Sequence, residues 1–205
     1  MQNTLPPVFL ERLSNIIPAL SFADVVSSFG GEGAMSVRVN TLQASRQDVL
    51  QELQALKVSF QEITWYHDAL ILKGLSAKEY SELELVKKNW LYRQSLSSML
   101  PVLILNPKAG ERVLDFCAAP GSKTTQMSAQ MNNQGEIIAV EAIRPRFYKL
   151  KAVCALLGAA NVLFKLTDAR RFRSMELFDK VLVDAPCSSE GRFKINDAKS
   201  VGYWS

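Results

Sequence analysis

The chain has 205 residues, of which 48% are hydrophobic and 21% charged, a composition typical of a globular protein in water. No apolar run approaches the roughly 18 residues of a membrane span, and the first residues lack the basic and apolar regions of a secretory signal. The three cysteines are too few for a disulfide framework, so we expect a reducing, cytoplasmic location.

The formal net charge of +4 permits binding to nucleic acid but does not establish it. The basic residues form three groups that could contact RNA phosphates, although charge runs are more often solvated surface. These groups are Arg144, Arg146, Lys149 and Lys151; Arg170, Arg171 and Arg173; and Arg192 and Lys194.

The N-terminal part of the chain has apolar residues at helical spacing. Residues 5–29 predict two short helices that end at Gly30, within an N-terminal helical segment that we assign to residues 1–35. Residues 36–40 are rich in strand-forming side chains and predict the first strand.

The next region combines one helix with further strands. We expect Ser45 to cap a helix whose first turn contains Asp48. Residues 63–65 and 69–72 predict a pair of strands, so that a small β-α-β-β subdomain lies within residues 36–90.

Strands and helices alternate after Leu105, which predicts parallel βαβ units in a doubly wound sheet. We assign residues 91–205 to this α/β domain and expect the first four strands of a Rossmann-like sheet. Its strands are predicted at 112–116, 137–140, 161–166 and 179–183, and its helices at 123–131 and 145–157.

Four features follow these strands, at the edge where open α/β sheets bind ligands. In the first loop, Gly121 lets the backbone approach a ligand, and free N–H groups at the helix N-terminus favour a carboxylate. Lys123 adds a cation close by. The other three features are the acids Glu141, Asp168 and Asp184.

The acids favour a nucleoside ligand that has no diphosphate. We expect Glu141 to bind ribose hydroxyls and Asp168 an adenine amino group, although each acid alone could be an ordinary strand-end residue. The loop lacks the G-x-G-x-x-G and phosphate-loop patterns. A ribose, an adenine and a charged amino-acid tail fit best, which predicts S-adenosylmethionine as the cofactor and no metal.

The fourth strand is followed by Pro186-Cys187, which suggests cytosine as the methyl acceptor. A thiolate that adds to C6 of cytosine makes C5 nucleophilic, so that C5 can take a methyl group from a sulfonium; C5 then loses its proton and the thiol is eliminated. The base must then be flipped out or single-stranded. The alternative for Cys187 is a buried small hydrophobe. We expect Cys154 to lie in the core and Cys117 to shape the loop.

These motifs resemble the Nop/Sun family of RNA 5-methylcytosine methyltransferases, and most closely its bacterial subgroup that modifies small-subunit ribosomal RNA. The resemblance implies a class I methyltransferase sheet and an RNA-recognition-like subdomain over residues 36–90. The segments that carry it are Arg38–Leu42, Leu91–Gln94, Ser97–Leu100, Gly110–Thr125 and Asp184–Gly191.

The resemblance also implies roles for single residues. Glu141 would hold the ribose, Asp168 would lie on the adenine side, and Arg146 would support the cofactor region. Asp184 would face both methyl donor and cytosine, and Cys187 would help to release the product. The methionine part would be wrapped by Cys117, Ala118, Ala119, Pro120, Gly121, Ser122 and Lys123.

The sequence departs from the family pattern at Ser122 and Ser189, where glycine is usual and a Cβ is tolerable only if φ is negative. The family's attacking thiol lies in a later Thr-Cys-Ser motif, and we expect the chain to be an N-terminal fragment that binds cofactor weakly without turnover. In the alternative, Cys187 is itself the nucleophile.

The sequence leaves two rival functions open. One is a non-catalytic RNA-binding protein that uses the β-α-β-β unit and keeps a vestigial cofactor site. The other is a methyltransferase with a protein or small-molecule acceptor. We expect RNA, more specifically rRNA, as the partner of a monomer that does not bind membranes.

Overall fold

The fold was analysed in a computed structural model that describes residues 5–31, 35–188, 190–195 and 197–201. The chain divides into two compact units, one of residues 1–33 with 186–205 and one of residues 34–185, and each is described by itself. Within the described residues, no helix is long and apolar enough to cross a membrane.

The smaller unit contains the two predicted N-terminal helices, α1 (Pro7–Ser14) and α2 (Ala19–Ser28). Two short helical segments from the end of the chain join them, η2 (Glu190–Arg192) and α9 (Ala198–Val201). The ring of Phe9 packs edge-on against Phe29 and Phe193, with centroid distances of 5.5 and 5.0 Å. An aromatic cluster therefore joins two segments that are far apart in sequence.

The first sheet of the larger unit is antiparallel, with the strand order β2-β3-β1-β4. A capping box at Ser76 begins one of its helices. Its elements are β1 (Met35–Val39), α3 (Arg46–Ala55), β2 (Phe60–Glu62), β3 (Ala69–Leu72), α4 (Ala77–Glu82), α5 (Glu84–Lys87) and β4 (Leu91–Arg93).

The sequence predicted this sheet only in part. The Ser45 cap is confirmed, because its hydroxyl accepts a hydrogen bond from the amide of Asp48. The prediction of a strand at 63–65 is wrong: residues 60–62 pair with β3, and the following residues form the turn into it. Strand β4 was not predicted, and it carries the sheet past residue 90.

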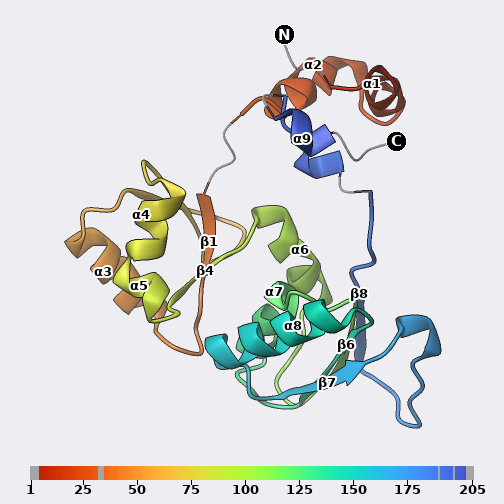
Figure 1. The fold of residues 1–205 in the computed structure, drawn as a ribbon. Coiled ribbons are helices and arrows are strands. Elements are labelled where there is room, and N and C mark those ends of the chain that lie inside the picture. The colour runs from red at the N-terminus through yellow and green to blue at the C-terminus, as the bar shows by residue number, and fades with distance from the viewer. Residues whose placement is uncertain (1–4, 32–34, 189, 196, 202–205) are drawn as a thin grey trace. The chain divides into compact units, whose positions relative to one another are not determined.

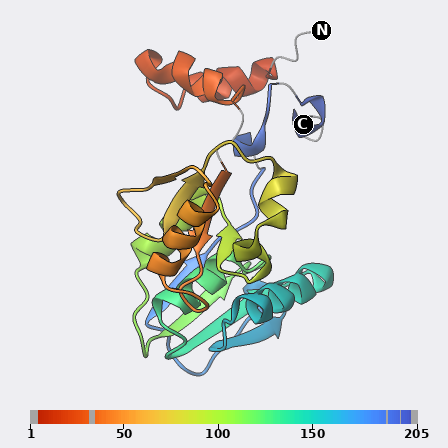
Figure 2. The same ribbon diagram turned by 90° about the vertical axis from the view of Figure 1, so that its left-hand side faces the viewer.

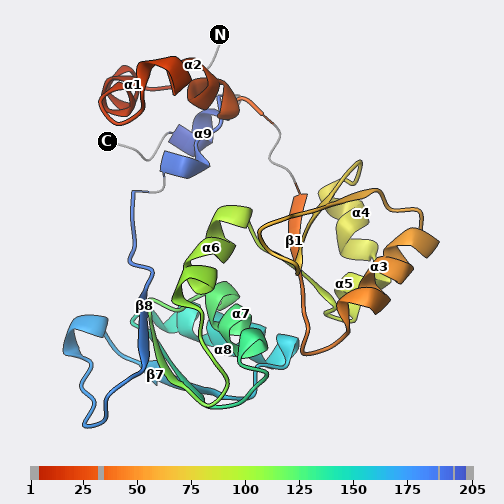
Figure 3. The same ribbon diagram turned by 180° about the vertical axis from the view of Figure 1, so that it is seen from behind.

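Both faces of this sheet are covered. Val37 and Leu70 pack on one face against α3, and α4 and α5 cover the same face. Figure 1 and the reverse view in Figure 3 show β1 between these helices and α6, and Figure 2 views the unit from their side. On the other face, Ala69 packs against Met99 of α6 (Leu96–Leu105).

The second sheet is parallel, with the strand order β7-β6-β5-β8, which confirms the predicted Rossmann-like α/β class. Among the described residues its helices cover one face, so the second helical layer of a doubly wound sheet is not seen. The predicted helix–strand alternation is also confirmed, with small shifts at the ends. Its elements are β5 (Arg112–Phe116), α7 (Ser122–Gln130), β6 (Glu136–Glu141), α8 (Arg144–Leu157), β7 (Val162–Leu166), η1 (Ala169–Arg171) and β8 (Lys180–Val183).

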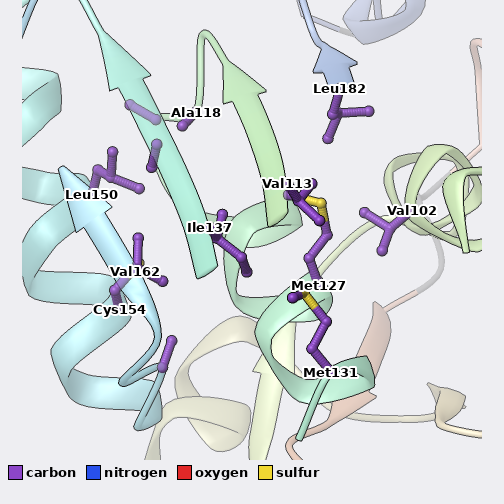
Figure 4. Packing of buried hydrophobic residues seen from close by; sticks show 13 residues of the cluster. Val102, Val113, Ala118, Met127, Met131, Ile137, Leu150, Cys154, Val162 and Leu182 are labelled. Carbon is purple, nitrogen blue, oxygen red and sulfur yellow. The ribbon is translucent and has the colours of Figure 1, made fainter. Parts of the chain in front are cut away.

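The main core lies on one face of the parallel sheet, where α6, α7 and α8 contribute side chains such as Val102, Met127 and Leu150 (Figure 4). Cys154 is part of this core, as predicted. The opposite face carries a smaller cluster around Ile138, which the loop residues Phe172 and Phe178 cover in part.

Candidate cofactor-binding and catalytic site

The strand register aligns three predicted site residues at the carboxyl edge of the parallel sheet. Phe116 of β5 is paired with Val140 of β6 and Val183 of β8, so the next residue of each strand falls in the same line. We call the three residues Cys117, Glu141 and Asp184 the edge row. Parallel pairing thus brings together residues that are up to 67 positions apart in sequence.

The loop between β5 and α7 is held against the sheet by its backbone. The amide of Ala118 donates to the carbonyl of Val140 at 3.0 Å, and Cys117 has a left-handed φ of 60°. Gly121 has φ 108°, and a Cβ there would lie 3.1 Å from Leu150 of α8. The left-handed φ and the close approach of α8 both favour glycine at this position, and the predicted approach of a ligand to its backbone stays a prediction.

Ser122 follows as the first residue of α7, in helical conformation. Its extra Cβ is therefore tolerated, in agreement with the condition set by the sequence. Ser189, the second departure from the family pattern, lies outside the described residues.

Lys123 connects this loop to the end of β8. Its Nζ donates to Oδ2 of Asp184 at 2.6 Å and to Oγ of Ser98 at 3.3 Å. The Lys123 side chain is only 12% exposed, whereas that of Asp184 is 51% exposed. The carboxylate is thus fixed from inside and open to a ligand from outside.

Glu141 has the environment of an incomplete binding site. Its side chain is 3% exposed, and Oε1 accepts a hydrogen bond from the amide of Ile143 at 2.9 Å. Within the described residues, the buried Oε2 has no hydrogen-bond partner. A buried carboxylate oxygen without a donor is costly, so a ligand hydroxyl would stabilise it.

Arg146 lies beside this carboxylate and also holds the loop. Nη1 is 3.7 Å from Oε2 of Glu141, and Nη2 donates to the carbonyl of Ala119 at 2.9 Å. One side chain therefore links the predicted ribose site to the predicted methionine loop, and its support of a bound cofactor stays a prediction.

Asp115 lies directly beneath the edge row and is 1% exposed. Thr124 donates to its Oδ2 at 2.6 Å, while Oδ1 has no partner within the described residues. Burial raises the pKa of this carboxyl to about 7, against the lowering effects of Thr124 and Lys123. Together with Oε2 of Glu141, Oδ1 of Asp115 is thus a second buried carboxyl oxygen at the site that lacks a hydrogen-bond donor within the described residues.

Asp168 is already engaged by a neighbouring side chain. Its carboxylate caps η1 and accepts hydrogen bonds from the backbone and guanidinium of Arg170. These hydrogen bonds lower the pKa of Asp168 to about 2. The predicted contact of this carboxylate with adenine would have to share oxygens that Arg170 uses.

The three cysteines differ in environment. Burial, and then the nearby Glu141, raise the pKa of the Cys117 thiol, which fits a loop-shaping residue better than a nucleophile. Burial raises the pKa of Cys154 to about 12. Cys187 is exposed and belongs to the smaller unit, so its part in the chemistry stays a prediction.

The sequence did not assign roles to three residues of this region. Ser98 binds Lys123, and the only sign of it was its place in a family segment. Asp115 was included only as a member of the predicted strand at 112–116. Ile143 is 52% exposed two residues after Glu141, and a single apolar side chain in a loop gives no sequence signal.

The described residues contain no cluster of three or more His, Cys, Asp or Glu side chains that could hold a metal ion. The polar groups of the site are suited to hydrogen bonds with a ligand. They are the carboxylate of Asp184, the buried Oε2 of Glu141 and the Nζ of Lys123 at the N-terminus of α7.

Two family models match the chain. One, described as 16S rRNA methyltransferase RsmB/F, matches residues 102–200. The other, described as the ferredoxin-like domain of RsmF/B-like methyltransferases, matches residues 5–77. The chain belongs to the RsmB/F methyltransferase family.

A curated relative supports this membership. The ribosomal RNA small subunit methyltransferase F of Serratia proteamaculans is 39% identical over 98% of the chain. The alignment covers 43% of that relative, so the chain spans less than half the length of the curated relatives that it matches.

Solved structures show the same fold. A methyltransferase homologue from Pyrococcus horikoshii is 27% identical with a TM-score of 0.72, covering 97% of this chain and 69% of its own. The structure of NSun6 from the same organism with SFG has a TM-score of 0.78 at 21% identity, covering 91% and 72%. The RsmB/F chain thus has a Rossmann-like sheet and an N-terminal ferredoxin-like domain.

The ferredoxin-like sheet of this RsmB/F chain differs from an RNA-recognition module in one respect. Such a module stacks RNA bases on the sheet face opposite its helices. Here that face carries the fully buried Arg38 and Ala69, and α6 covers it. Arg38 and Ala69 on this face are therefore not available for base stacking.

Proposed function

We propose that the chain binds S-adenosylmethionine at the edge row and forms part of an enzyme that methylates C5 of a cytosine in ribosomal RNA. The observation that carries the proposal is the buried Oε2 of Glu141, which has no donor within the described residues and lies in line with Asp184.

The residues present fit this cofactor. A ribose hydroxyl would donate to Oε2 of Glu141, and the exposed side chain of Ile143 offers an apolar surface to an adenine ring. A carboxylate would find the first amides of α7 and the Nζ of Lys123 at the helix N-terminus. The positive end of that helix favours an anion.

The bound cofactor supplies a methyl group on a positively charged sulfur. The residues of the chain would orient the acceptor beside it. Asp184, held by Lys123, would accept a hydrogen bond from the cytosine amino group through its exposed oxygen. The Cys187 thiol would either add to C6 of the base as the nucleophile, and be eliminated after C5 has lost its proton, or assist the elimination of another thiol from C6 and so release the product.

The choice of ribosomal RNA rests on the relatives, which carry the name of a ribosomal RNA small subunit methyltransferase. The 205 residues contain no Thr-Cys-Ser motif, which in the family carries the attacking thiol. We propose that these residues bind the cofactor and that turnover also needs the thiol of that motif. We further propose that the protein is cytoplasmic and that it is a monomer. Analytical ultracentrifugation would test the oligomeric state.

Titration of the chain with S-adenosylmethionine by calorimetry tests the cofactor. We expect saturable binding with one site per chain and no heat with NAD or ATP. Heat from the dinucleotide but none from S-adenosylmethionine would overturn the proposal.

RNA that contains 5-fluorocytosine tests the acceptor, because it traps a thiol adduct at C6. An adduct that disappears in Cys187→Ser would assign the nucleophile to this thiol. Absence of an adduct, together with normal cofactor binding, would assign attack to a thiol outside these residues.

A further inference from the structure

Arg38 is a buried cation on the closed face of the ferredoxin-like sheet. It lies in β1, and none of its side chain is exposed. Its guanidinium carbon lies 5.8 Å from the centre of the Tyr92 ring. Burial lowers the pKa of Arg38, and the nearby Tyr66, Tyr92 and Asp68 oppose this effect.

The guanidinium binds neutral groups instead of a carboxylate. Nε donates to Oε1 of Gln94 at 2.9 Å, and Nη2 donates to Oγ1 of Thr125 at 3.0 Å. Within the part of the chain that the structure describes, Nη1 has no hydrogen-bond partner and no carboxylate lies within ion-pair distance. Burying a cation without an anionic partner is costly. An apolar side chain of similar length would avoid this cost.

Thr125 provides one connection between Arg38 and the site. It lies in the first turn of α7, two residues after Lys123. Its hydroxyl accepts from Arg38 and donates to the carbonyl of Ser122 at 3.1 Å. The guanidinium therefore holds the helix turn from which Lys123 projects.

Gln94 provides a second connection. Its Nε2 donates to Oε1 of Gln126 at 2.8 Å and to the carbonyl of Ser98 at 3.3 Å. The hydroxyl of Ser98 in turn accepts from Nζ of Lys123. Both partners of Arg38 thus lead to the same lysine, one through its backbone and one through its side chain.

We propose that Arg38 is a positioning residue for Lys123, through which the ferredoxin-like domain sets the geometry of the Lys123–Asp184 pair in the cofactor site. The benefit for cofactor binding rests on the proposed function, whereas the effect on Lys123 does not.

Matched substitutions at Thr125 test the connection. Thr125→Val removes the hydroxyl with little change of shape, and Thr125→Ser keeps it. Arg38→Met removes the guanidinium and keeps most of the side-chain length. Val49→Ala is the control, because Val49 is fully buried in α3 and has no part in the connections to Lys123.

The first measurement is the rate at which an acetylating reagent labels Lys123, followed by mass spectrometry without any cofactor. The lysine is 12% exposed and reacts slowly if it is held. We expect the rate to rise severalfold in Thr125→Val and Arg38→Met and to stay at the wild-type value in Thr125→Ser and Val49→Ala. Equal rates in all five proteins, or an equal rise in Val49→Ala, would overturn the proposal.

The second measurement is the Kd for S-adenosylmethionine, taken well below the unfolding temperature of each variant. We expect about a tenfold rise in Thr125→Val, the effect of about one hydrogen bond to a charged group, and no change in Thr125→Ser. If the wild-type chain does not bind S-adenosylmethionine, the proposed function fails, and the labelling rates still decide the role of Arg38.

Discussion

The two sheets of the larger unit differ in what their surfaces leave open. The antiparallel sheet is covered by α3, α4 and α5 on one face and by α6 on the other, and it buries Arg38 completely. The parallel sheet is covered by helices on one face and presents polar groups at its carboxyl edge, where Asp184 is 51% exposed.

This difference suggests that the antiparallel sheet supports its neighbours and that the parallel sheet carries the ligand site. A covered sheet face cannot receive a base, so the antiparallel sheet contributes by fixing the elements beside it. An open strand edge with an unsatisfied Glu141 can receive a ligand. Substitutions on the two sheets would show whether one surface is closed and the other open.

The largest effect is expected at Asp115. Its pKa of about 7 lies above the ordinary 3.8, so between these pH values the folded chain keeps a proton that the unfolded chain has lost. Its contribution to stability therefore falls as pH rises through this window and levels off above it. Asp115→Asn stays neutral and should be more stable at pH 8 by up to about 4 kcal/mol.

Urea unfolding of Asp115→Asn and the wild-type chain at pH 5 and pH 8 measures this effect. The stability difference between the two proteins should grow with pH. A difference that is the same at both pH values would show that the Asp115 carboxyl ionises normally and that water reaches it beneath the edge row.

The next largest effect compares the two faces of the parallel sheet. Ile137→Ala removes a fully buried side chain from the helix-covered core and should cost about 3 kcal/mol. Leu163→Ala alters the opposite face, where the side chain is 49% exposed, and should cost about 1 kcal/mol or less. Thermal unfolding measures both, and equal losses would contradict the one-sided core.

A smaller effect tests whether the antiparallel sheet is closed. Ala69 is fully buried against Met99, so Ala69→Leu overpacks this face and should cost about 2 kcal/mol. Gln61 of β2 is exposed, and Gln61→Leu serves as the control with little expected change. If Ala69→Leu is as stable as the wild type, the face is open, as in an RNA-recognition module.

The sequence predicted the parallel sheet well because each strand there is a short apolar run that ends in an acid before a turn. The antiparallel sheet was harder to predict. Residues 63–65 have strand-forming side chains, yet tertiary pairing selected residues 60–62. Strand β4 has three residues, too few to show a period.

The site was predictable where it follows from topology. The end of each parallel strand is visible in the sequence, so Glu141, Asp168 and Asp184 could be placed at one edge. Contacts between side chains could not be predicted in this way. The bond from Ser98 to Lys123 and the engagement of Asp168 by Arg170 depend on rotamers and packing.

The buried Oε2 of Glu141 is the group that we propose binds a hydroxyl of S-adenosylmethionine. Calorimetric titration of Glu141→Ala tests it most directly, with Glu136→Ala at the opposite end of β6 as the control. We expect about a 100-fold rise of the Kd in Glu141→Ala, because a hydrogen bond to a buried charge is lost, and an unchanged Kd in Glu136→Ala. An equal Kd in the wild-type chain and Glu141→Ala would contradict it.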